Sequence, residues 1–188
     1  MPRAGLSEDR VVEEAELLAD EGEPVTLAVL ARRLGVQVPS LYKHVAGADD
    51  LQRLMSIRAK NEFADVLARA AVGKAGGDAL AALSTAYREW ATAHPGRYAT
   101  TLRAPDAEDS DDLAASSRAI QVIFDALGGY GLGDQDLIDA TRIFRSSLHG
   151  FVTLVAAGAF ALPDLDRSFR RMVAMFRLSL DEWSSLTI

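Results

Sequence analysis

The chain has 188 residues, of which 49% are hydrophobic and 25% are charged, the balance of a globular protein rather than a disordered one. It has no cysteine, which excludes disulfides, thiolate metal sites and thiol nucleophiles. Its 27 acidic residues against 20 Lys and Arg give a formal net charge of -7, so any contact with DNA has to come from a local patch.

The first three predicted helices are short and closely spaced. Helical periodicity predicts a helix from Ser7 to about Glu21, a second from Thr26 to Leu34 and a third from about Gln37 to Val45. Thr26 is placed to cap the second helix, and Gly35 is placed to end it in the left-handed region. Two short helices joined by a glycine-containing turn, after a bracing helix, are typical of a helix-turn-helix.

The rest of the chain is also predicted to be helical, with about nine helices in total. A long fourth helix opens at Gly47, Asp49 and Asp50, and we interpret Val72–Asp78 as the linker that ends it. Four or five helices follow, and the acidic stretch "PDAEDSDD" between two of them is interpreted as a solvated loop, because its spacing does not match an EF-hand.

The last two predicted helices, about 134–158 and 164–183, carry apolar residues at alternating steps of three and four. This spacing favours an antiparallel pair, and such a pair in a short chain often completes a four-helix bundle with a second subunit. The alternative is that the two stripes pack inside one subunit.

One window of this acidic chain, Pro24 to Ala48, contains no Asp or Glu. A carboxylate beside DNA phosphates is repelled and releases no counterions, so DNA binding explains the window. With Leu41 and Val45 facing inward, the exposed side of the third helix carries donors and acceptors that could read base edges, and two hydroxyls lie where they could contact phosphates. The base-reading candidates are Gln37, Ser40, Lys43 and His44, and the phosphate candidates are Thr26 and Tyr42. A solvated face on an all-helical interaction or scaffold module is the alternative.

Residues Ser7 to Leu51 resemble the N-terminal domain of TetR/AcrR transcriptional regulators. The match lies in "RVVEEAELLADEG", "VTLAVLARRLGV" and "PSLYKHV". The resemblance implies an all-α fold, with a three-helix helix-turn-helix DNA-binding domain at 1–60 and a larger helical-bundle domain for ligand binding and dimerisation at 61–188. It also implies a recognition helix with DNA contacts from Thr26, Gln37, Pro39, Ser40, Tyr42, Lys43 and His44.

Two positions depart from the family pattern. Gln37 stands where the family often has Ser or Thr, and Ala48 stands where it often has a phosphate-gripping Lys. Losing one phosphate contact weakens affinity without changing sequence preference, unless Lys43 and Arg3 compensate.

The segment "SSLHGFVTLVAAGAF" (Ser146 to Phe160) resembles a TetR-type regulatory domain with a Trp/Leu-His-Gly signature, here Leu148, His149 and Gly150. A helical bundle that binds an apolar effector needs aromatic residues around a cavity and a few polar groups to orient the ligand. The candidates are Tyr87, Trp90, Phe124 and Phe144, with Arg145 and His149 as the polar groups.

The sequence contains no recognisable catalytic motif, and its three histidines are too dispersed for a histidine-rich metal site. We therefore expect no enzyme activity, cofactor or metal. The opening residues contain no apolar signal core and no apolar run is long enough to span a bilayer, so we expect a cytoplasmic protein that does not bind membranes. The predicted function is a homodimeric repressor that binds a palindromic DNA operator and is released by a small apolar effector.

Overall fold

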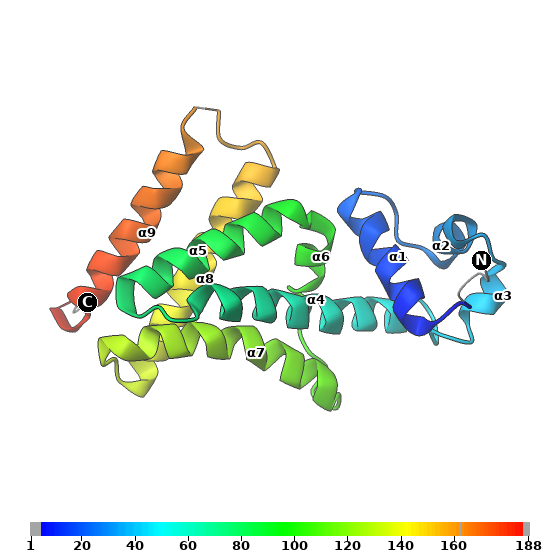
Figure 1. Ribbon diagram of the computed structural model, residues 1–188, viewed down its shortest axis with the longest axis horizontal. Coiled ribbons are helices and arrows are strands. Elements are labelled where there is room, and N and C mark those ends of the chain that lie inside the picture. The colour runs from blue at the N-terminus through cyan, green and yellow to red at the C-terminus, as the bar shows by residue number, and fades with distance from the viewer. Residues whose placement is uncertain (1–4, 162, 186–188) are drawn as a thin grey trace. The chain divides into compact units, whose positions relative to one another are not determined.

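The computed structural model describes residues 5–161 and 163–185, and the regular structure in those residues is entirely helical (Figure 1). Within these ranges there are nine α-helices and two 3-10 helices: α1 Glu8–Asp20, α2 Leu27–Leu34, α3 Val38–Leu41, α4 Ala48–Ala71, α5 Gly76–Ala93, α6 Pro95–Thr100, α7 Ser110–Leu127, η1 Gly128–Tyr130, α8 Asp134–Ala156, α9 Leu165–Asp181 and η2 Trp183–Ser185. The prediction of an all-α fold with about nine helices is confirmed. None of the described helices is long and apolar enough to cross a membrane.

The chain divides into two compact units. The N-terminal unit contains the residues up to Glu62 together with Ala93–Ser116, and the C-terminal unit contains Phe63–Thr92 and the residues from Ser117 onward. The predicted functional domains, 1–60 and 61–188, stay a prediction, because a division by packing does not test which part binds DNA and which binds a ligand.

The first helices of the N-terminal unit begin and end where local capping signals predict. The Ser7 hydroxyl accepts from the Arg10 N–H at 3.3 Å, and the Thr26 hydroxyl accepts from the Val29 N–H at 3.2 Å. Gly35 ends α2 with φ of 68°, in the left-handed region. The four helices bury a common core: Val11, Val12, Ala15, Leu18, Leu30, Ala31, Leu41, Val45, Leu51 and Met55.

The third helix is shorter than the sequence predicts. The pattern predicted Gln37 to Val45, but α3 ends at Leu41 and continues as a hydrogen-bonded turn through His44. The Leu41 carbonyl accepts from both the His44 N–H at 2.8 Å and the Val45 N–H at 3.0 Å, which tightens the chain into that turn. Leu41 and Val45 are buried as predicted.

The linker interpretation of Val72–Asp78 was wrong at its C-terminal end. Gly76, Gly77 and Asp78 form the first turn of α5, where the Asp78 carboxylate lies at the positive end of the helix dipole.

Helix α6, which the sequence indicated only as a break at Pro95, packs closely on α1 within the N-terminal unit. A Cβ at Gly96 would lie 2.0 Å from the Ala19 carbonyl carbon, so only glycine allows this approach. Arg97 then donates to Asp20 from its backbone N–H at 2.8 Å and from Nε at 2.7 Å. Its guanidinium also contacts Glu62 on α4 at 3.0 Å.

Glu16 on α1 is a buried carboxylate of the N-terminal unit. The Glu16 side chain is 4% exposed; its Oε2 lies 3.2 Å from Arg58 Nε and its buried Oε1 has no hydrogen-bond partner. Burial raises the pKa of Glu16 from 4.5 to about 7, against the opposing charges of Arg58 and Arg97. Below about pH 7 the folded unit therefore favours a protonated Glu16.

Replacing Glu16 with Gln is expected to flatten the pH dependence of stability. Because the folded pKa lies above the unfolded value, the contribution of Glu16 is complete below pH 4.5 and is lost as the pH rises through 7. The loss is about 3 kcal/mol by the usual conversion of a pKa shift. Urea unfolding at pH 5 and pH 8 measures it, with the exposed Glu13→Gln change on the same helix as the control. If the Glu16→Gln protein keeps the parent's pH dependence of stability, the pKa of Glu16 is not raised by folding.

The C-terminal unit is built around two groups of aromatic side chains. Phe63 on α4 meets Tyr87 and Trp90 of α5 at ring-centroid distances of 5.0 and 4.9 Å. Between α8 and α9, the rings of Phe144 and Phe176 lie 4.9 Å apart and those of Phe151 and Phe169 lie 5.1 Å apart.

These pairings run in opposite directions along α8 and α9, so the two helices are antiparallel, as predicted. The apolar stripes meet inside one subunit, which was the alternative left open for these residues.

Candidate functional site

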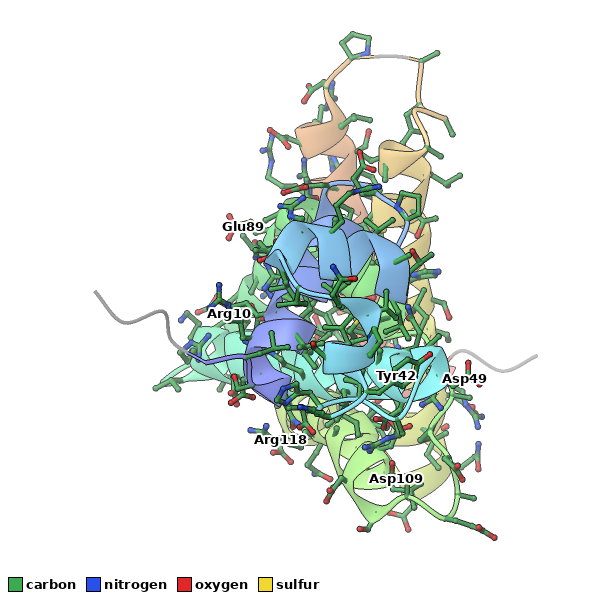
Figure 2. All side chains as sticks on the ribbon, turned by 90° about the vertical axis from the view of Figure 1, so that its right-hand side faces the viewer. Arg10, Tyr42, Asp49, Glu89, Asp109 and Arg118 are labelled. Carbon is green, nitrogen blue, oxygen red and sulfur yellow. The ribbon has the colours of Figure 1, made fainter. Side chains whose placement is uncertain are left out.

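The seven residues predicted to contact DNA lie at the start of α2 and on α3 and its following turn, two helices that pack against each other. Figure 2 labels Tyr42 on that turn and Asp49 at the start of α4. The side chains of Thr26, Gln37, Pro39, Tyr42 and Lys43 are exposed, and those of Ser40 and His44 are half-buried. The carboxylate-free window therefore presents polar and cationic groups to solvent.

Local hydrogen bonding leaves two of these side chains able to make new contacts. Gln37 is the N-cap of α3 but makes no side-chain capping hydrogen bond, so its amide is not used by the helix. The Thr26 hydroxyl uses an acceptor position for the Val29 N–H and keeps its own proton to donate. The Gln37 amide can donate to and accept from a base edge. Thr26, at the N-terminus of α2, lies where free backbone N–H groups favour a phosphate.

Arg33 lies in the carboxylate-free window, but its charge is neutralised by two carboxylates that lie outside the window. Its Nε donates to Glu14 at 2.5 Å, and its two other nitrogens bind both carboxylate oxygens of Glu21. Both acids belong to α1 or its C-terminal cap, so Arg33 holds α2 against α1. Arg33 thus lies inside the window Pro24–Ala48, but its charge is used to join α2 to α1.

The turn after α3 is tied to the loop before α7 by a chain of polar contacts. Asp50 accepts from the Ala46 N–H at 2.8 Å and from Arg53 Nε at 3.1 Å. Arg53 then donates to Asp109 at 2.8 Å, and Asp109, just before α7, is labelled in Figure 2. Backbone N–H donation from Asp112, together with Arg53, lowers the pKa of Asp109, so the carboxylate stays charged.

Most of the acidic stretch is exposed, as its sequence indicated, but Asp112 in the first turn of α7 is an exception. Asp112 is fully buried and accepts from Lys60 Nζ at 2.7 Å, where Lys60 is itself 5% exposed. Arg103 donates to the second carboxylate oxygen of Asp112 at 2.6 Å. Burial acts to raise the pKa of Asp112, but the Lys60 ammonium and the other donors hold it below its usual range. The first turn of α7 is thus anchored to α4 by a buried ion pair.

The six predicted effector residues have different surroundings in the C-terminal unit. Tyr87, Trp90 and Phe144 are core residues, and Phe124 is half-buried. Arg145 is exposed, and the half-buried His149 has its Nδ1 3.5 Å from the Thr153 hydroxyl. The structure brings Tyr87 and Trp90 together around Phe63, while Phe144 packs on α9.

A cavity that the sequence did not predict lies between α5 and α9 in the C-terminal unit, with a volume of about 400 Å³. Its signal in the sequence is the pair of arginines, Arg170 and Arg177, seven residues apart around the apolar Val173 and Ala174. The pattern alone does not say which helix faces them.

Comparison with known proteins identifies the family. Residues 80–176 match the family described as "Tetracyclin repressor-like, C-terminal domain". The HTH-type transcriptional regulator Rv0681 of Mycobacterium tuberculosis is 38% identical over 173 residues, covering 90% of this chain and 79% of the relative. The HTH-type transcriptional regulator YobS of Bacillus subtilis is 32% identical over 163 residues, covering 85% and 84%.

A solved structure shares the whole fold. The TetR family protein ActR of Streptomyces coelicolor, in complex with actinorhodin, aligns with a TM-score of 0.69 at 19% identity, covering 96% of this chain and 97% of that one. The match of the family model and the two sequence relatives establish that the chain, with its helix-turn-helix of α2 and α3, belongs to the TetR family of helix-turn-helix transcriptional regulators.

Proposed function

We propose that the protein is a homodimeric, ligand-responsive transcriptional repressor that binds a palindromic DNA operator in the cytoplasm. The observation that carries the proposal is the exposed, carboxylate-free surface of residues 24–48 in a protein whose net charge is -7. An all-helical scaffold module has no need of such a surface, whereas DNA phosphates require it.

In this proposal α3 and its turn enter the major groove. Gln37, Ser40, Lys43 and His44 read base edges, while Thr26 and Tyr42 hold phosphates and set the register. Pro39 contacts DNA in the first turn of α3, as the family resemblance implies. Arg3, which could offset the missing lysine at Ala48, lies outside the described residues.

The proposed dimer forms through α8 and α9, over about 134–158 and 164–183. The phenylalanines of both stripes are used inside the subunit, so the interface uses the apolar residues that remain exposed. Ile143 is 49% exposed and Met175 is 69% exposed, and both line one depression between α8 and α9. Exposed apolar groups that gather in this way favour a protein contact. A two-fold axis there would present two recognition elements about one DNA turn apart.

The proposed effector is a small apolar molecule bound in the C-terminal unit, and the ligand complex of ActR supports a ligand site in this fold. The candidate residues remain Tyr87, Trp90, Phe124 and Phe144, with Arg145 and His149 as polar partners. We also propose the Trp/Leu-His-Gly subgroup for the C-terminal domain, on Leu148, His149 and Gly150. The bound effector favours a state in which the two DNA-binding units no longer match the operator.

Two measurements on the unmodified protein test this function. Selection of fragmented DNA from the source genome is expected to enrich one inverted repeat, and sedimentation at micromolar concentration is expected to give a dimer. A monomer that enriches no sequence would favour the scaffold alternative.

A further inference from the structure

The cavity between α5 and α9 is a groove with one wall from each helix. Gly77, Ala81 and Thr85 line it at four-residue spacing on α5, a length of about 12 Å at the helical rise. The α9 wall consists of Phe169, Arg170, Val173, Ala174, Arg177, Leu178 and Asp181. A volume of about 400 Å³ falls within the range of small-molecule sites.

Small side chains on α5 make room for the groove and for one of its arginines. A Cβ at Gly77 would lie 2.6 Å from Arg177 Nε, so the guanidinium side chain lies directly against the first turn of α5. The Thr85 hydroxyl donates to the Ala81 carbonyl at 2.9 Å, so α5 satisfies that polar group itself. The α5 wall is therefore narrow and largely apolar.

The side chains that line the groove carry more positive than negative charge. Arg170 and Arg177 line it together with one acid, Asp181, and neither arginine forms a salt bridge within residues 5–161 and 163–185. The neighbouring Arg88 differs, because it pairs with Asp166 at 2.6 Å and lies over the Phe169 ring at 4.9 Å. In a protein with an excess of acidic groups, an apolar groove with two unpaired guanidinium groups is complementary to an anion.

The Arg177 end of the groove has a further polar group nearby. The buried hydroxyl of Tyr130 has no hydrogen-bond partner in the described residues. Asp181 and Arg177 lie close enough to Tyr130 for both charges to act on its hydroxyl. The Tyr130 hydroxyl is buried and does not line the groove, so Arg170 and Arg177 are left to bind a charged head group, while Phe169, Val173 and Leu178 provide apolar contact.

We propose that the α5–α9 groove binds an amphipathic organic anion, with its carboxylate on Arg170 or Arg177 and its apolar body along Val173 and Leu178. The groove shares none of its lining residues with the proposed effector site around Tyr87 and Phe144. The proposal therefore goes beyond the proposed function and does not depend on it.

Calorimetric titration with decanoate, and with 1-decanol as the uncharged analogue, tests the proposal. The parent is expected to bind decanoate more tightly than 1-decanol. The double change Arg170→Ala and Arg177→Ala is expected to weaken decanoate binding roughly tenfold or more, because charge-assisted hydrogen bonds are lost. The matched control is Arg69→Ala with Arg118→Ala, two exposed arginines of α4 and α7 that line neither depression. This control is expected to keep the parent's affinity.

A variant with a large side chain in the groove tests whether decanoate binds there and not at another surface. Ala81→Trp is expected to remove decanoate binding and to leave the sedimentation of the protein unchanged. Equal binding of decanoate by the parent and by the Arg170/Arg177 variant would overturn the proposal. So would an Ala81→Trp protein that changes its oligomeric state, because a second copy of the chain would then occupy the groove. DNA binding measured on the same variants reports on the proposed function separately.

Discussion

Replacing Lys43 with Glu is expected to abolish sequence-specific DNA binding while leaving the helical content unchanged. Lys43 is exposed on the turn after α3, inside the carboxylate-free window. The change substitutes a negative for a positive charge beside the phosphates, so the complex releases fewer counterions and gains a repulsion. We expect at least about a 100-fold loss of affinity near 0.15 M salt, with a shallower salt dependence. Fluorescence anisotropy with the selected operator measures both, and circular dichroism checks the fold.

The control for this experiment is Lys74→Glu, which makes the same change of net charge outside the window. Lys74 is exposed in the segment between α4 and α5, where its ammonium contacts the Ala70 carbonyl. If location determines the effect, Lys74→Glu keeps most of the parent's affinity. A Lys43→Glu protein that binds the operator as tightly as the parent at equal salt would show that α3 and its turn do not contact the DNA.

Replacing Asp112 with Ala is expected to destabilise the N-terminal unit by about 3–5 kcal/mol. The change leaves the Lys60 ammonium in the interior without its 2.7 Å partner. Arg103 is partly exposed and can turn to water, but Lys60 is held on α4. Urea unfolding followed by circular dichroism measures the loss, and the first transition is expected to move to lower urea.

Two further variants test whether the loss of stability in Asp112→Ala comes from the unpaired buried charge of Lys60. Asp111→Ala removes an exposed acid from the same first turn of α7, so it has the same effect on the helix dipole without exposing a buried charge. Replacing Lys60 with Met and Asp112 with Leu together removes both charges and is expected to recover most of the stability. Equal stability of the Asp112→Ala and Asp111→Ala proteins would mean that the buried pair contributes little.

The parts of the fold that local signals determine could be predicted from the sequence. Ser7, Thr26 and Gly35 act on backbone groups within four residues of themselves, so their effects do not depend on the rest of the fold. The apolar periodicity of α5, α8 and α9 likewise predicts which face of each helix is buried. It does not say what covers that face, and for this reason the stripes of α8 and α9 could not be assigned to the subunit core in advance.

Contacts between distant segments could not be predicted in the same way. Arg97 meets Asp20 across 77 residues, and Lys60 meets Asp112 across 52. In each case a charged residue in a polar stretch looks like a solvated one until the fold brings its partner near. Arg33 shows the consequence for the candidate site, because it lies within the carboxylate-free window and yet pairs with Glu14 on α1 and with Glu21 at the C-cap of α1.

Protection mapping of the selected DNA by the unmodified protein tests the central claim most directly. If two recognition elements read a palindromic site, nuclease protection is expected over two half-sites about one DNA turn apart and related by a two-fold axis. A scrambled sequence of the same composition is expected to show no protection at that protein concentration. Equal protection of both DNAs, or none at concentrations where the protein is folded and dimeric, would contradict sequence-specific DNA recognition by α3 and its turn.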